Sequence, residues 1–241
     1  MTNAGRPVIL GAMPTFAFTA PPPSGLLPKL AAYRRRYGVT HALTRFAATK
    51  VPAIWPVVGP LVSRGYRERW IRQAGVKLLN LGGGSNTIEG ALTADLDPRA
   101  DTYMNLAKRL PFEDASIDLI FTEEFIEHIP KAAAAIMLQE CARVLKPGGV
   151  LRIATPDLDW LSAGTLDGSV PCDLVNDSFY GHGHRYLYSR AAMAKAVREA
   201  GFSDIRHSTY KDPASQLGYL DSHADRFNHS PLLSQYVEAV R

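Results

Sequence analysis

A short apolar run that ends directly in glycines is the feature that most constrains how this chain folds. Residues 76–81 read Val-Lys-Leu-Leu-Asn-Leu, and Gly82–Gly84 follow at once. A run of this kind is typical of a strand buried on both faces, and the glycines let the next turn approach a ligand closely. A second predicted strand ends near Asp95, where an acid can accept hydrogen bonds from both hydroxyls of a ribose. Together these features predict a nucleotide-type site at the carboxyl edge of a parallel sheet.

The remainder of the chain alternates predicted strands with helices, which favours an α/β, doubly wound Rossmann-like sheet with helices on both faces. A helix is expected to begin at Glu123, and Pro156–Gly183 is expected to be a long irregular stretch. The other expected strands lie near residues 103–104, 116–121, 150–155, 204–209 and 234–240, and the other expected helices cover 131–145 and 189–200.

Residues 1–74 differ in composition and are predicted to form a Pro-rich leader and a basic, partly helical extension, with the α/β domain spanning 75–241. Residues 1–75 hold eleven Lys and Arg against the single acid Glu68, whereas the rest holds sixteen against twenty-two. Four interpretations remain for the extension: a cap packed on the domain, a contact with an anionic membrane surface, a contact with RNA, or disorder.

The overall composition excludes several classes of protein. With 46% hydrophobic residues, 21% charged residues and two cysteines, the chain is neither disordered throughout nor a disulfide scaffold. Its longest charge-free stretch, residues 7–28, contains internal prolines and is not expected to span a bilayer as a helix. A cytoplasmic location, including one peripheral to the membrane, is the expectation.

Six motifs in order resemble those of the class I S-adenosylmethionine-dependent methyltransferases, over about residues 76–206. They are Leu79-Asn80-Leu81-Gly82-Gly83-Gly84, Asp95, Leu110-Pro111-Phe112, Asp114–Asp118, Glu127-His128 and Arg143-Val144-Leu145-Lys146-Pro147-Gly148-Gly149. The resemblance implies a class I methyltransferase sheet of seven strands whose last two form an antiparallel edge, and S-adenosyl-L-methionine as the cofactor.

The resemblance also implies a set of cofactor contacts. The glycines would line the methionine and ribose part, Asp95 rather than Asp97 would hold the ribose hydroxyls, and Asn105 with the Leu106 backbone would meet the adenine; the set is Gly82, Gly83, Gly84, Asp95, Asn105, Leu106 and Glu123. Two departures stand out. The family commonly has Asp in place of Asn105, and only ten residues separate Gly84 from Asp95, too few for the usual helix between the first two strands.

The predicted catalytic residues follow the fourth strand. If Glu123 starts a helix, Glu124, Glu127 and His128 share one face, and two carboxylates with an imidazole suit a divalent cation such as Mg²⁺. The spacing is similar to that of metal-dependent small-RNA 2′-O-methyltransferases and of the O-methyltransferases of ubiquinone synthesis, in which a later histidine completes the site. His184 stands in the comparable place, with His182 as its neighbouring alternative.

Without a metal, His184 or His128 is expected to act as the general base, because neutral imidazole accepts a proton near pH 7. Arg185 is predicted either to hold an acidic substrate or to form a structural ion pair. Trp160 and Tyr180 fall in the stretch expected to build the acceptor pocket, where they either contact the substrate or pack the lid.

The sequence therefore predicts a cytoplasmic S-adenosylmethionine-dependent methyltransferase that most readily methylates oxygen on a small molecule or on a glycan or lipid-linked precursor. The first alternative is an RNA 2′-O-methyltransferase, which the basic extension and the Glu-x-x-Glu-His spacing suggest. The second is a protein that keeps the fold for binding and has lost the chemistry.

Overall fold

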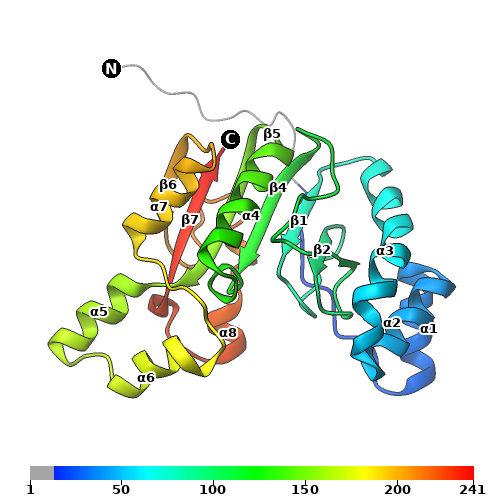
Figure 1. Cartoon of the computed structure of the whole chain (residues 1–241), viewed down its shortest axis with the longest axis horizontal. Helices are drawn as coiled ribbons and strands as arrows, with labels where there is room; N and C mark the ends of the chain where they lie inside the picture. Colours follow the sequence, from blue (N-terminus) through cyan, green and yellow to red (C-terminus); the bar gives the residue numbers. More distant parts are fainter. Residues whose placement is uncertain (1–13) are drawn as a thin grey trace.

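The computed structural model describes residues 14–241, so the first half of the predicted leader lies outside the described residues. A seven-stranded sheet occupies the centre, with β1 to β5 parallel and β7 inserted antiparallel between β5 and β6 (Figure 1). The strand order is β3-β2-β1-β4-β5-β7-β6. The predicted seven-stranded class I sheet, with the last two strands antiparallel to each other, is therefore confirmed. The strands are β1 (Leu78–Leu81), β2 (Leu92–Asp95), β3 (Thr102–Tyr103), β4 (Ile117–Glu123), β5 (Leu145–Pro156), β6 (Asp204–Ser208) and β7 (Ser234–Val240).

Within residues 14–241, eight α-helices surround the sheet. They are α1 (Leu26–Tyr37), α2 (Val39–Lys50), α3 (Trp55–Arg72), α4 (Lys131–Val144), α5 (Leu158–Asp167), α6 (Cys172–Asn176), α7 (Arg190–Glu199) and α8 (His223–Phe227). Side chains of α3, α4 and α7 pack on one face of the sheet, in a core that includes Trp70, Met137 and Met193. None of the described helices combines the length and apolarity that a membrane crossing requires.

The opposite face is covered without a long helix. No helix links β1 to β2 in the described chain, as the ten-residue spacing predicted, and an N-terminal strap, defined here as residues 14–25, lies there instead. Phe18 of the strap forms an antiparallel bridge with Ile88, and Phe16 packs in a second core with Leu217 and Leu220 from the connection between β6 and β7. The strap therefore takes the place of the missing helix.

The basic extension packs on the β2–β3 side of the sheet (Figure 1). The buried Asp101 accepts hydrogen bonds from the Tyr37 hydroxyl (2.6 Å) and the Thr93 backbone N–H (3.0 Å), and Arg36 forms an ion pair with it at 2.9 Å. Arg45 is also buried and donates to the Pro98 carbonyl. Part of the positive charge of the extension is thus used inside the protein.

Two expectations about local structure were wrong. No α-helix begins at Glu123: β4 runs through Glu123, Glu124 has a φ of 51°, and only a 3₁₀ turn, Ile126–His128, follows. Pro130 explains the short turn, because it holds Ile129 in an extended conformation that ends any helix. The stretch 156–183 is also not irregular, since it contains α5, α6 and one π-helical turn.

Candidate active site

Asp95 ends β2 with its carboxylate turned toward the glycine loop after β1. Its Oδ2 accepts a hydrogen bond from the Gly84 backbone N–H at 2.9 Å, and its Oδ1 accepts one from the Asp97 N–H at 3.0 Å. A carboxylate has about four acceptor positions, so capacity remains for two further donors. Burial raises the pKa of Asp95 above its ordinary value. The geometry suits a group that holds a diol.

Asp97, the other acid considered for the ribose, is engaged elsewhere. Its carboxylate forms an ion pair with Arg99 at 2.5 Å and also accepts from the Arg99 backbone N–H at 2.7 Å. This arrangement closes the turn after β2, as expected for an acid beside Pro98.

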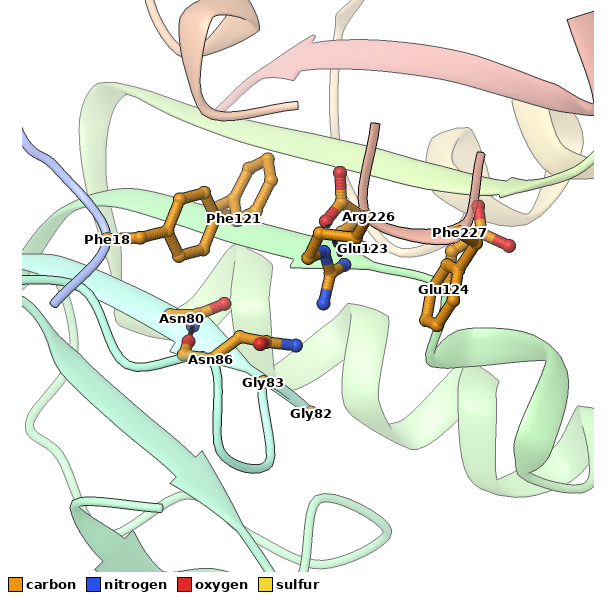
Figure 2. Close-up of a pocket in the computed structure, with 10 residues that line it drawn as sticks. All are labelled: Phe18, Asn80, Gly82, Gly83, Asn86, Phe121, Glu123, Glu124, Arg226 and Phe227. Atoms are coloured by element: carbon orange, nitrogen blue, oxygen red, sulfur yellow. Dashed lines mark hydrogen bonds and ion pairs between the residues drawn. The ribbon is translucent and has the colours of Figure 1, made fainter. Parts of the chain in front are cut away.

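The glycine loop is tightly packed as well as open to a ligand. Gly82 has a φ of 71°, and a Cβ there would collide with the Phe125 ring. A Cβ on Gly83 would collide with the Asn80 side chain, which holds the loop by donating to the Asn86 carbonyl at 2.8 Å. Figure 2 shows this loop beside Asn80 and Asn86, with Phe18 of the strap lying next to Phe121 above them.

Asn105 and Leu106 lie just after β3, on the same side of β1 as Asp95. The Asn105 Oδ1 accepts from the Ala107 backbone N–H at 3.0 Å, so this side chain already shapes a local turn. Leu106 is buried in the main core. The half-buried Asn105 amide is the polar group that this segment offers to a ligand.

Glu123, a predicted cofactor contact, lines the pocket at the glycine loop and also anchors the start of α8. Its carboxylate accepts from the Ser222 backbone N–H (2.6 Å) and hydroxyl (2.9 Å), and Arg226 pairs with it at 2.5 Å (Figure 2). Burial would raise its pKa, but hydrogen bonds with His223 and Ser222 and the charge of Arg226 outweigh burial and lower it. Sequence reasoning missed these partners because they lie about 100 residues away along the chain.

A pocket of about 540 Å³ opens next to this edge of the sheet, and it gathers the predicted catalytic residues. It is lined by Glu124, Glu127, His128, Pro156, Leu174, Asp177, Ser178, His182, His184, Phe227, His229 and Leu233. A smaller pocket of about 120 Å³ adjoins the glycine loop. Glu124 and Phe227, drawn in Figure 2 among the residues of the smaller pocket, also line the larger one and therefore stand between the two.

The ionisable groups of the larger pocket have shifted pKa values. Burial, together with the charge of Glu127, raises the pKa of Glu124 to about 8. Burial raises the pKa of Glu127 to about 7, and it lowers those of His128 and His184. Carboxyl groups with raised pKa values and imidazole groups with lowered ones suit a site in which protons are transferred.

The four residues predicted to bind a metal are only partly brought together. Donor atoms of Glu127, His128 and His184 lie within 4.8 Å of one another, whereas Glu124 is outside this cluster. Glu124 is separate because its left-handed backbone breaks the helix that would have aligned it with Glu127.

The predicted acceptor aromatics do not line the 540 Å³ pocket. Trp160 packs against a small core under α5, and Tyr180 is 80% exposed. Arg185 is exposed and forms no ion pair within residues 14–241; its backbone N–H donates to the Glu127 carbonyl at 2.6 Å. Three further lining residues, Phe227, His229 and Leu233, come from the C-terminal segment, where no sequence motif pointed to a site.

Comparison with known proteins finds a methyltransferase domain in part of this chain. A family model described as a methyltransferase domain matches residues 70–153. A crystal structure of a SAM-dependent methyltransferase from Archaeoglobus fulgidus aligns with a TM-score of 0.50 at 12% identity, over 88% of this chain and 99% of that one, which is a likeness of fold.

Two curated relatives match over shorter segments. The chain is 39% identical over 67 residues to a "Probable S-adenosylmethionine-dependent methyltransferase" of Mycolicibacterium smegmatis, a match covering 28% of this chain and 25% of that protein. It is 35% identical over 102 residues to the biotin biosynthesis bifunctional protein BioHC of Cellvibrio japonicus, covering 42% and 18%. The chain therefore matches a quarter or less of the length of these relatives.

Residues 70–153 match a methyltransferase domain, and they contain the glycine loop and Asp95. The seven-stranded sheet has the fold of a SAM-dependent methyltransferase.

Proposed function

We propose that this protein transfers the methyl group of S-adenosylmethionine to an oxygen of a small molecule, or of a glycan or lipid-linked precursor. The observation that carries the proposal is the position of Glu124, which lines both the pocket at the glycine loop and the 540 Å³ pocket. A methyltransferase needs a donor site and an acceptor site that meet at one point, because the displacement is in line.

The residues at the sheet edge fit the cofactor. The free acceptor positions of Asp95 match two ribose hydroxyls, and the half-buried Asn105 amide can meet the adenine edge. When bound, S-adenosylmethionine supplies an electrophilic methyl group on a sulfonium. The chain needs only to align the acceptor with it and to remove one proton.

We assign proton removal to Glu124. Its Oε1 accepts a hydrogen bond from the Ser234 hydroxyl at 2.8 Å, which fixes the side chain, while its Oε2 has no hydrogen-bond partner among residues 14–241. In its ionised form, Glu124 can therefore accept at this Oε2 the proton of an acceptor hydroxyl in the larger pocket. His128 and His184 line the same pocket.

The chemistry of the larger pocket favours a hydroxylated small acceptor over RNA. Its volume of about 540 Å³ is in the range of small-molecule sites. Its lining carries carboxyl and imidazole groups, and none of the described residues that line it is Lys or Arg. A phosphate backbone would call for such cations.

The extension also offers a surface that suits anionic lipid. A groove of about 240 Å³ between α1 and α2 is lined by Leu27, Leu30, Ala31, Arg34, Val39, Ala42 and Leu43. Leu27 and Leu43 are exposed by 76% and 56%, beside the exposed Arg34. Apolar side chains next to basic ones are typical of contacts with an anionic membrane surface.

Calorimetric titration with S-adenosylmethionine tests the donor site. The wild-type protein should bind one equivalent, and Asp95→Ala should weaken binding by about 2 to 4 kcal/mol, since each hydrogen bond to a charged group contributes about 1 to 2 kcal/mol. Asp97→Ala is the matched control and should bind normally. Weakened binding in Asp97→Ala with normal binding in Asp95→Ala would assign the ribose contact to Asp97. A folded wild-type protein that does not bind S-adenosylmethionine would contradict the proposed enzymatic function.

A separate assay tests Glu124. Release of S-adenosylhomocysteine is measured with a panel of phenols, catechols and sugars, and Glu124→Gln should lose at least about 100-fold in kcat with the active acceptor while retaining cofactor binding. Full turnover by Glu124→Gln would move proton removal to His128 or His184.

A further inference from the structure

The strongest feature that the proposed reaction leaves unused is a cluster of three donor side chains in the wall of the 540 Å³ pocket. Glu127 Oε1 lies 3.8 Å from the Nε2 atom of His128, and the ring centroids of His128 and His184 are 4.8 Å apart. Ligand atoms around one divalent ion lie about 3 to 3.5 Å from each other, given metal–ligand distances near 2.1 Å. Small side-chain rotations therefore suffice to bring the three onto an ion.

An unsatisfied buried oxygen points to a missing partner at this place. The Glu127 carboxylate is fully buried, and its Oε2 accepts from the Thr155 hydroxyl at 2.8 Å. Its Oε1 has no hydrogen-bond partner in the described structure. Buried polar atoms are nearly always satisfied, so an orphan carboxylate oxygen facing two imidazoles calls for a ligand.

The imidazoles are held with lone pairs free for metal binding. His184 Nδ1 contacts the Ser178 carbonyl, which can only accept, so this nitrogen carries the proton and Nε2 is unprotonated in the neutral ring. His128 makes a backbone hydrogen bond with Gly183. Backbone carbonyls that fix the tautomer in this way are common behind the histidines of metal sites.

The backbone fixes His184 next to Glu127 although 57 positions separate them. The N–H groups of Arg185 and Tyr186 both donate to the Glu127 carbonyl, at 2.6 and 3.2 Å. Two main-chain hydrogen bonds set the position of the segment that carries His184, so the cluster is preformed rather than a chance meeting of surface side chains.

We propose that Glu127, His128 and His184 bind a divalent transition-metal ion, such as Zn²⁺, Mn²⁺ or Co²⁺, whose open positions face the acceptor. Two imidazole nitrogens and one carboxylate oxygen suit such ions, whereas Mg²⁺ prefers oxygen ligands throughout. Since Glu124 is not in the cluster, the donor set no longer matches the magnesium expected from the sequence. The inference rests on the proposed function for the role of the ion, which is to bind the acceptor oxygen whose proton passes to Glu124.

The site is tested by titrating Co²⁺ into the chelator-treated full chain. The visible absorption of the bound cobalt is the readout. Saturable one-to-one binding is expected, and it should weaken by at least about tenfold in His184→Ala and in His128→Ala. His182→Ala is the matched control, because that histidine lines the same pocket but pairs with Asp177 at 2.9 Å outside the cluster. It should bind Co²⁺ like the wild type, and competition with Zn²⁺ should displace the cobalt.

Two outcomes would overturn the metal site: absence of saturable Co²⁺ binding in the folded protein, or equal weakening by the His182 and His184 substitutions. Glu127→Gln provides a further check, since it keeps the shape of the side chain and removes the charge; unchanged affinity there also counts against the site. The proposed function is tested apart from this one, because S-adenosylmethionine binding is measured on the metal-free protein. Loss of that binding contradicts the methyltransferase activity, not the ion.

Discussion

A single buried ion pair fixes the connection between β6 and β7 to the sheet. Arg152 on β5 is fully buried and pairs with Asp221 at 2.5 Å, and it also donates to the Thr209 carbonyl at 3.0 Å. The next residue, Ser222, holds Glu123, so this pair supports the wall of the pocket from behind. A buried charge is stable only beside a partner of opposite charge, because water does not reach it.

Asp221→Ala is therefore expected to reduce the free energy of unfolding by about 3 kcal/mol, since it leaves the buried Arg152 guanidinium with only the more distant Glu238 carboxylate, at 3.9 Å, as a counter-charge. Urea denaturation measures this loss. The double variant Arg152→Met/Asp221→Leu should recover much of it. As a control, breaking the exposed pair Lys195–Glu199 should change stability by about 0.5 kcal/mol or less. A similar small effect at Asp221 would contradict the structural role of the pair.

For single residues, the sequence predicted the position of a side chain when its partners lie close to it along the chain. Asp95 lies beside the glycine loop as expected, because both follow directly from the ends of adjacent strands. Glu123 and Glu124 could not be assigned in this way. Their partners Ser222, Arg226 and Ser234 come from a distant segment, and no local pattern encodes such contacts.

Among the elements, helix α2 carries a histidine that makes the extension sensitive to pH. His41 is buried between Tyr37 and Tyr66, and neither ring nitrogen has a hydrogen-bond partner within the part of the chain that the structure describes. Burial, aided by the charges of Arg45 and Arg69, lowers its pKa to about 4. The folded state thus keeps this histidine neutral over a range in which the unfolded chain binds a proton.

Because the folded pKa lies below the unfolded value near 6.5, stability is fully present above pH 6.5 and is lost as the pH falls toward 4. Between pH 7 and pH 5 the loss should be about 1 kcal/mol after allowance for solvent screening. His41→Leu should flatten this part of the profile. Urea denaturation of both proteins at pH 7 and pH 5 measures the difference, and parallel profiles would contradict the assignment.

The strap and the turn after β4 show where sequence reasoning fails at the level of elements. Most strands were predicted because buried parallel strands are continuous apolar runs. The helix expected at Glu123 failed because Glu124 adopts a left-handed conformation and Pro130 ends the turn. The strap has no periodicity of its own: Thr19 and Ala17 bond to the loop around Ile88, a pairing that only the tertiary fold determines.

The strap should matter for stability. Phe16 is 7% exposed in the second core, and its backbone N–H donates to the Tyr219 hydroxyl at 3.1 Å. Phe16→Ala should cost about 3 kcal/mol of unfolding free energy, at the low end for a buried phenylalanine because the strap is short. Thr15→Ala, one residue earlier and exposed, is the control. A cost below about 0.5 kcal/mol for Phe16→Ala, which is within the range of surface substitutions, would mean that the strap does not stabilise the sheet.

At the scale of the whole molecule, the charge of the extension separates into an internal part and an external part. Arg36 and Arg45 hold α1 and α2 on the Asp101 side of the sheet, so they are unavailable to a partner. Arg34 and Arg35 remain at the surface, next to the apolar groove of α1 and α2. What the extension presents outward is therefore apolar as much as it is basic, which favours a lipid surface over a nucleic acid.

Co-sedimentation with vesicles distinguishes these partners. Binding to phosphatidylserine vesicles should weaken with salt but persist in part, because the apolar contribution of Leu27 and Leu43 is not screened. The double variant Leu27→Ser/Leu43→Ser should lose this salt-resistant part, while Leu232→Ser, an exposed leucine outside the extension, should leave it unchanged. RNA binding would instead fall steeply with salt and would not respond to the leucine substitutions. A protein that binds RNA in this way and ignores vesicles would reverse the assignment of the surface, and with it the preference for a lipid-linked acceptor.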